Sequence, residues 1–285
     1  MKLSMKKKAD FMLFATAIGW AMSTILIKLY LEDTPVFHIM FGRYFFAFAL
    51  TAFIWRKKFK AISKKEWIAG SLLSIFLFMA YSFAVMSLSY TSASKSGFFV
   101  AMSVLFVPIV STILKRRLPN VWVTSSVLIS IVGLYLVAGI NGGGFNGGDG
   151  LALLCAAAYT VYILMMDKYA KDMEASHLVL IQLGVVTLIS LVAMVGVEGV
   201  QVTAITDQIW PILAIAVFGT AITSLAQTNA QKYASPESVG LILLGEPLFT
   251  LIFAAIILNE TLVVKGLIGA GLLLTAMVIT ILKDV

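Results

Sequence analysis

The chain has 285 residues, of which 60% are hydrophobic and 12% are charged, and its formal net charge at pH 7 is +7. These few polar side chains cannot cover the surface of a soluble globular protein of this length. The composition therefore excludes a soluble globular protein and indicates an integral membrane protein. The positive charge does not point to nucleic acid, because the lysines and arginines are divided among short loops without interleaved aromatic residues.

Ten apolar stretches are long enough to cross a hydrocarbon core of about 30 Å, for which about 20 helical residues suffice. In chain order they lie near 9–30, 36–55, 67–87, 94–114, 120–139, 150–168, 177–196, 208–230, 237–258 and 264–282. The predicted fold class is therefore an all-α integral membrane protein with ten transmembrane helices.

The basic residues gather at three places along the chain. Clusters precede the first stretch and follow the second and the fourth, at Lys2, Lys6, Lys7, Lys8, then Arg56, Lys57, Lys58, Lys60, Lys64, Lys65, then Lys115, Arg116, Arg117. With ten spans, all three clusters lie on one side of the membrane. The positive-inside rule then predicts a multi-pass protein of the inner or plasma membrane with both termini in the cytoplasm.

The second half of the chain repeats the first. An offset of 139 residues aligns Trp20 with Tyr159 and His38 with His177. Later in the chain, an offset of 143 residues aligns Tyr90 with Tyr233 and Gly97 with Gly240. We predict a five-helix unit at 1–140, a glycine-rich connection at 141–149 and a second five-helix unit at 150–285. Because five spans are an odd number, the two units enter the bilayer from opposite sides, which is typical of secondary transporters.

One carboxylate stands near the predicted membrane midplane. Glu246 lies ten residues into the ninth stretch, where an ionised group costs at least about 2.5 kcal/mol, so it faces the interior, is protonated or has a partner. It is a candidate for coupling or substrate contact, and the alternative is a hydrogen-bonded residue that joins two helices.

Pro247 cannot donate to the carbonyl of Leu243, which predicts a kink beside Glu246. Pro108 in the fourth stretch aligns with Leu251, so we expect the bends at different heights.

Four further candidates are aromatic or cationic. Trp20, Tyr81 and Tyr159 supply rings at mid-span that would stack on an organic substrate, or simply pack the bundle. The guanidinium of Arg43, in the second stretch, suits an anionic group or a structural role equally well.

Two polar residues complete the candidate site. Gln227 lies deeper in the eighth stretch than Asn229, and the two cannot face the same way on a helix, so Gln227 is preferred. Lys95 opens the fourth stretch, where it would attract acidic substrates or extend to the interface. His38 and His177 have no second ligand at metal spacing, so we predict neither metal nor cofactor.

These residues lie in a pattern that resembles the EamA-type ten-span carriers of the drug/metabolite transporter superfamily, over about residues 9–283. The matching residues are Trp20, Lys28, Pro35, Phe41-Gly42-Arg43, Tyr90-Thr91-Ser92-Ala93, Gly97-Phe98, Gly148-Asp149-Gly150, Ala156-Ala157-Ala158-Tyr159, Gln227 through Tyr233, Gly240, Gly245-Glu246-Pro247 and Asn259-Glu260-Thr261-Leu262. The resemblance implies proton- or gradient-coupled export or exchange of amino acids, metabolites or drugs. Ser103 and Arg117 stand where many relatives carry acidic residues, which argues against a symmetric two-carboxylate mechanism.

The leading hypothesis is an alternating-access carrier of a small organic metabolite, monomeric in the lipid bilayer and not an enzyme. The alternative is a membrane-embedded sensor, receptor or enzyme that binds without transport. An intramembrane hydrolase would need a catalytic dyad or a metal site, and a channel would need a charged ring or a filter within a span. The sequence shows none of these patterns.

Overall fold

The computed structural model describes residues 4–30, 34–91, 93–116, 118–138, 145–257 and 264–283, with the side chains of 93–95 and 138 excepted, and every regular element in these ranges is a helix. The elements are α1 (Met5–Tyr30), α2 (Val36–Ile54), η1 (Phe59–Ala61), α3 (Lys64–Leu88), α4 (Ala93–Val100), α5 (Ser103–Lys115), α6 (Val121–Ala138), α7 (Gly147–Tyr169), η2 (Ala170–Asp172), α8 (Ala175–Ala193), η3 (Met194–Glu198), α9 (Val202–Thr206), α10 (Ile209–Ala216), η4 (Val217–Ala221), α11 (Ile222–Ala230), α12 (Pro236–Leu243), α13 (Gly245–Ile257) and α14 (Val264–Leu282).

Nine helical segments in the described ranges are long and apolar enough to cross a membrane, and they coincide with nine of the ten predicted stretches. The remaining stretch forms a shorter apolar helix at Val121–Val137, so the tenth span stays a prediction. Large apolar side chains such as Phe53, Val192 and Ile256 stand on the outer surface, where lipid would cover them. The chain is a multi-pass helical membrane protein.

Local sequence determines where several helices begin. Ser63 and Glu66 form a reciprocal capping box at the start of α3, and Asn146 and Asp149 form another at the start of α7. Ser235 caps α12, whose first residue is a proline that needs no amide partner there. Of the glycine-rich connection, residues 141–144 lie outside the described ranges.

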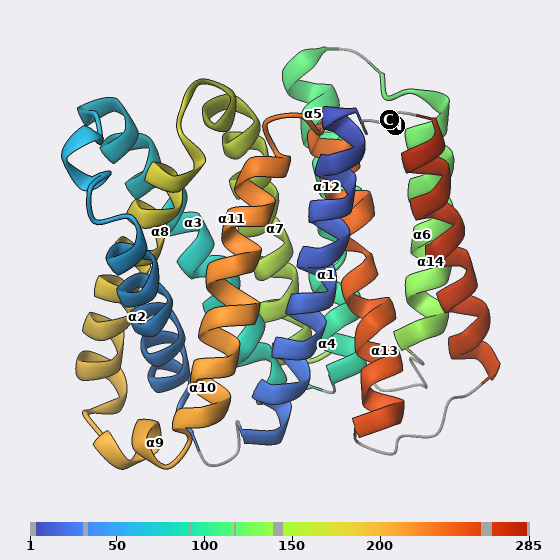
Figure 1. Cartoon of the computed structure of the whole chain (residues 1–285). Helices are drawn as coiled ribbons and strands as arrows, with labels where there is room; N and C mark the ends of the chain where they lie inside the picture. Colours follow the sequence, from blue (N-terminus) through green and yellow to red (C-terminus); the bar gives the residue numbers. More distant parts are fainter. Residues whose placement is uncertain are drawn as a thin grey trace.

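Helices of the two halves pack against each other throughout the bundle. α2 packs on α8, α3 on α7, and α1 on both α11 and α13, while α6 and α14 run side by side along one edge (Figure 1). A Cβ added to Gly269 on α14 would lie 2.6 Å from the carbonyl oxygen of Gly133 on α6, so this contact requires glycine. The start of α1 and the end of α14 lie at one end of the molecule, here named the termini end, and α9 lies at the opposite end (Figure 1).

Two of the membrane helices are interrupted near their middle. α4 ends at Val100 and α5 begins at Ser103, and α12 ends at Leu243 and α13 begins at Gly245. The helix breaks at Leu244, beside Glu246, where the sequence predicts a kink. The expectation that the two bends lie at different heights is wrong, because Pro108 is accommodated inside α5 and the break precedes it at 101–102, which the 143-residue offset aligns with 244–245.

Candidate functional site

A cavity of about 180 Å³ lies between the two interrupted helices. Its wall comes from both halves of the chain, with residues of α1, α2, α3, α4, α5, α6, α7, α12 and α13. On α1 the wall runs from buried Trp20 to exposed Lys28, and it includes Leu88 at the end of α3. The cavity therefore reaches from the middle of the bundle toward the opposite end.

Glu246 is the only acidic side chain among the described residues that line this cavity. It stands in the first turn of α13, where the positive end of the helix dipole favours a carboxylate. Thr24 Oγ1 on α1 donates a hydrogen bond to Glu246 Oε1 at 3.3 Å. Pro247 lines the cavity beside it. The interruption of the helix thus presents a carboxylate to the cavity within the bundle.

Arg43 lines the cavity and is 1% exposed. Its Nε donates to Thr220 Oγ1 at 3.0 Å and its Nη2 donates to the Gly219 carbonyl at 3.1 Å. The guanidinium also lies over the rings of Tyr44 and Tyr81, 5.5 and 5.2 Å from their centroids. Its hydrogen-bonding partners belong to η4, so Arg43 ties α2 to that turn, which is the structural role left open by the sequence.

η4 is a π-helical turn, a rare element that often occurs at functional sites. α1 approaches it closely, because a Cβ added to Gly219 would lie 1.6 Å from Ser23 Oγ and 2.9 Å from Ser23 Cβ. The glycine therefore permits α1 and η4 to touch beside the cavity.

The three predicted aromatic residues meet at the cavity. The ring of Trp20 packs edge-to-face against Tyr81 and Tyr159, with centroids 5.9 and 5.8 Å apart. All three line the wall. Gln227 is not among the described lining residues, and instead its Nε2 donates to the Tyr159 hydroxyl at 2.7 Å. Gln227 thus orients a wall residue.

Other lining residues were not singled out from the sequence. Thr24 lies one helical turn after Trp20, so the i, i+4 spacing would have placed it on the same face. Cys155, the single cysteine, also lines the cavity and is 4% exposed. The side chain of Lys95 lies outside the described residues. Among the residues that are described, no three His, Cys, Asp or Glu side chains are grouped to hold a metal ion.

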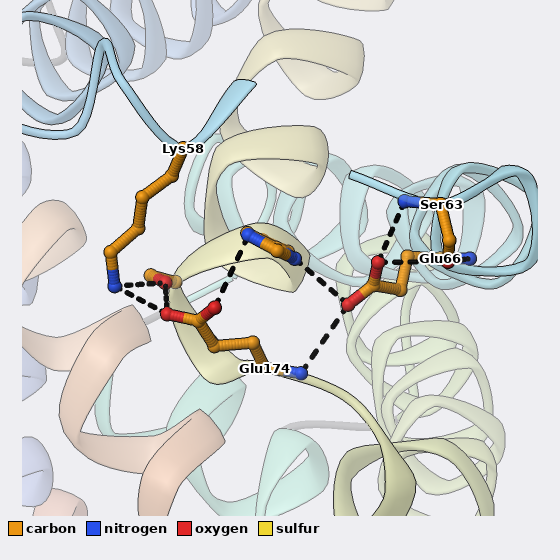
Figure 2. A network of polar contacts seen from close by, with 6 residues as sticks. Lys58, Ser63, Glu66 and Glu174 are labelled. Atoms are coloured by element: carbon orange, nitrogen blue, oxygen red, sulfur yellow. Dashed lines mark hydrogen bonds and ion pairs between the residues drawn. The ribbon is translucent and has the colours of Figure 1, made fainter. Parts of the chain in front are cut away.

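A second polar cluster, shown in Figure 2, includes none of the described lining residues of the cavity. It lies at the termini end, where α3 and α8 begin (Figure 1). His177 Nδ1 lies 2.9 Å from Glu66 Oε1, and its Nε2 lies 3.2 Å from Glu174 Oε2. Lys58, just after α2, pairs with Glu174, just before α8. Hydrogen bonds from Lys58 and Ser176 hold the pKa of Glu174 below its ordinary value of 4.5. This cluster joins the end of α2 and the start of α3 to the start of α8.

The aligned histidine forms a matching contact at the opposite end. His38 Nδ1 lies 2.9 Å from Glu198 Oε2, at the end of η3. The Phe37 amide donates to both oxygens of Glu198, and the Gln201 amide donates to His38 Nε2 at 3.0 Å. Each histidine of the repeat thus meets a carboxylate from the other half of the chain. The sequence contained the aligned histidines but did not reveal their partners.

The comparisons with known proteins agree with this architecture. The model of the EamA-like transporter family matches residues 7–139 and again residues 146–282. Two proteins of Archaeoglobus fulgidus, each named "Uncharacterized transporter", are 28% identical over 275 residues and 25% identical over 266 residues. The first match covers 96% of this chain and 86% of the relative, and the second covers 90% and 91%.

A solved crystal structure is 14% identical, with a TM-score of 0.78 and coverage of 97% of both chains. At that identity the likeness shows the fold alone. The family model, by contrast, matches nearly the whole chain in two successive segments. The chain therefore belongs to the EamA-like transporter family of the drug/metabolite transporter superfamily.

Proposed function

We propose that the protein is a secondary active transporter that moves a small organic metabolite by alternating access, in the direction of export. Amino acids, related metabolites and drugs are the proposed substrate classes. The observation that carries the proposal is the cavity between α4–α5 and α12–α13, with Glu246 in its wall. A break at membrane depth that lines a cavity is the arrangement that carriers use to bind substrates. Transport rather than enzymatic turnover is proposed because membership of a transporter family supports it.

The packing supports an inverted repeat of two five-helix units, in which α6 is the additional span that completes the set of ten. α3 packs on α7 and α1 packs on α11, which are equivalent contacts when the first unit is exchanged with the second. The pairs α2 with α8 and α6 with α14 each join equivalent helices. Such a molecule has two related packings, one open to each membrane face.

We further propose that substrate binding uses two kinds of contact. Glu246 supplies a proton-accepting carboxylate, and Thr24 supplies the hydroxyl that donates a hydrogen bond to it. Trp20, Tyr81 and Tyr159 supply aromatic ring surfaces. Glu246 is also the proposed proton-coupling residue. The protein is proposed to act as a monomer in the cell membrane, with both termini in the cytoplasm because the basic clusters flank that end. No nucleic-acid partner is proposed.

The test begins with ligand binding. Purified protein is heated with a panel of amino acids, nucleosides, sugars, polyamines and cationic drugs, because a ligand at about 100 times its Kd stabilises the native state by about 2.7 kcal/mol. A true substrate raises the melting temperature of the wild type, and Glu246→Gln loses that shift. Glu174→Gln is the matched control, since Glu174 is a carboxylate in the polar cluster away from the cavity.

Exchange in proteoliposomes then separates transport from binding. In the wild type, a pH gradient across the membrane should drive exchange of the labelled ligand. Glu246→Gln should abolish this pH-driven exchange while expression and folding are retained. Unchanged gradient dependence in that variant would remove Glu246 from the mechanism. A ligand that stabilises the protein without exchanging would favour the alternative, a sensor that binds without transport.

A further inference from the structure

Among the described residues, the polar contacts between the two interrupted helices lie at one end. Ser111 Oγ, near the end of α5, donates a hydrogen bond to Glu237 Oε1, in the first turn of α12, at 2.5 Å. Lys115 Nζ, in the last turn of α5, lies 3.4 Å from the same oxygen. Ser111 is 2% exposed and the Glu237 side chain is 15% exposed, so solvent competes weakly for this hydrogen bond.

These contacts lie beyond the cavity lining, on the side of the termini end. α4–α5 lines the cavity from Ser96 to Ser103, and α12–α13 lines it from Gly240 to Ala254. Glu237 precedes the second segment and Ser111 follows the first, so both stand on the side of the termini end. The helices thus pack most closely at that end, where α5 lies on α12, and toward the opposite end α4 and α13 make fewer contacts beside the cavity.

The repeat does not reproduce this contact at the opposite end. The 143-residue offset aligns Glu237 with Ser94 and Ser111 with Ala254. A serine replaces the carboxylate and an alanine replaces the hydroxyl donor. If the molecule inverts, the equivalent hydrogen bond to a carboxylate cannot form there, because neither group is present.

We propose that Glu237, Ser111 and Lys115 form a one-sided lock that holds the cavity closed at the termini end. The lock must break for the cavity to open toward that end, and the aligned residues Ser94 and Ala254 cannot form the same contact in the inverted state. This inference rests on the proposed alternating access. Its physical basis is that a contact made in one of two states shifts their populations by its own free energy.

The chain contains its own reporter for this equilibrium. Cys155 is the single cysteine and lines the cavity, so a membrane-impermeant maleimide added to sealed vesicles of known orientation reports which side opens to it. In the wild type we expect labelling from the opposite end, slowly because Cys155 is 4% exposed. In Ser111→Ala and Glu237→Ala, each of which removes one partner of the Ser111–Glu237 hydrogen bond, we expect labelling from the termini end to rise by about tenfold, the factor supplied by one hydrogen bond to a charged group.

Asp167→Asn is the control, because Asp167 pairs with Lys171 on the next turn of the same chain segment and joins no two helices of the cavity wall. If Cys155 reacts too slowly to follow, Thr250→Cys in a Cys155→Ser chain moves the reporter to another wall position. Unchanged labelling from the termini end in both lock variants, with the melting temperature retained, would overturn the lock. Because labelling requires no substrate, a shift in labelling without measurable transport would contradict the transport function and not the lock.

Discussion

Two helix pairs, each joining equivalent helices of the two halves, are fastened differently. α2 and α8 are held at both ends, by His38 with Glu198 at the opposite end and by Lys58 with Glu174 at the termini end, where His177 adds Glu66. α4–α5 and α12–α13 are joined by Glu237 at the termini end, and a cavity lies between them farther on. The first pair cannot separate at either end without breaking polar contacts. In the second pair, the polar contacts among the described residues lie at the termini end alone, so we infer that α2 and α8 form the fixed frame.

The largest expected effect on stability is at Glu66. Glu66→Ala removes the capping box of α3 and the partner of His177, so we expect a loss of roughly 2–4 kcal/mol in the free energy of unfolding, measured in detergent. Glu66→Gln keeps an oxygen for the capping box and should lose about half as much. A loss as small as that of a surface substitution, below about 0.5 kcal/mol, would contradict the frame.

A smaller effect is expected where α1 touches η4, the turn that Arg43 of α2 also contacts. Gly219→Ala places a Cβ 1.6 Å from Ser23 Oγ, and the required shift should destabilise the fold by roughly 1–3 kcal/mol. Ser23→Ala removes that oxygen but leaves the Ser23 Cβ position 2.9 Å away, so the double variant should recover only part of the loss. Melting temperatures of the single and double variants measure this coupling, and strictly additive losses would show that the close approach is not the cause.

The smallest effect is expected at Glu174, whose side chain is 48% exposed. Its folded-state pKa lies below 4.5, because Lys58 and Ser176 donate to it, so its contribution to stability is present above pH 4.5 and is lost as the pH falls through the folded pKa. Glu174→Gln should therefore melt slightly below the wild type at pH 7, and the difference should vanish well below pH 4.5. A difference that persists at low pH would assign the effect to something other than the carboxylate charge.

The membrane helices were predicted well because the hydrocarbon core imposes a length that hydropathy reports directly. The kink at Gly245 and Pro247 was predicted because proline removes a backbone donor. The break at 101–102 was missed, since Pro108 pointed to the wrong turn and no residue at the break has a comparable covalent constraint. The tenth span and the division at 1–140 and 150–285 stay predictions.

The candidate residues stay a prediction as a binding site, but the structure brings most of them together. Trp20, Tyr81, Tyr159, Arg43, Glu246 and Pro247 all line one cavity, which their residue types suggested but could not establish. Gln227 was expected to line the substrate path. It is not among the described lining residues, and it donates a hydrogen bond to the hydroxyl of Tyr159, which does line the cavity. The distinction depends on the rotation of α11 about its own axis, and the residue type does not report that rotation.

The sequence by itself determined that this is a helical membrane protein with a carboxylate at membrane depth, because the composition, the length of the apolar stretches and the position of Glu246 are local properties. Only the tertiary structure decided which side chains meet: His38 with Glu198, His177 with Glu66 and Ser111 with Glu237 are each more than 100 residues apart. The physical reason is that mostly apolar helices can pack in many rotations, and the closest packing of their small residues selects one.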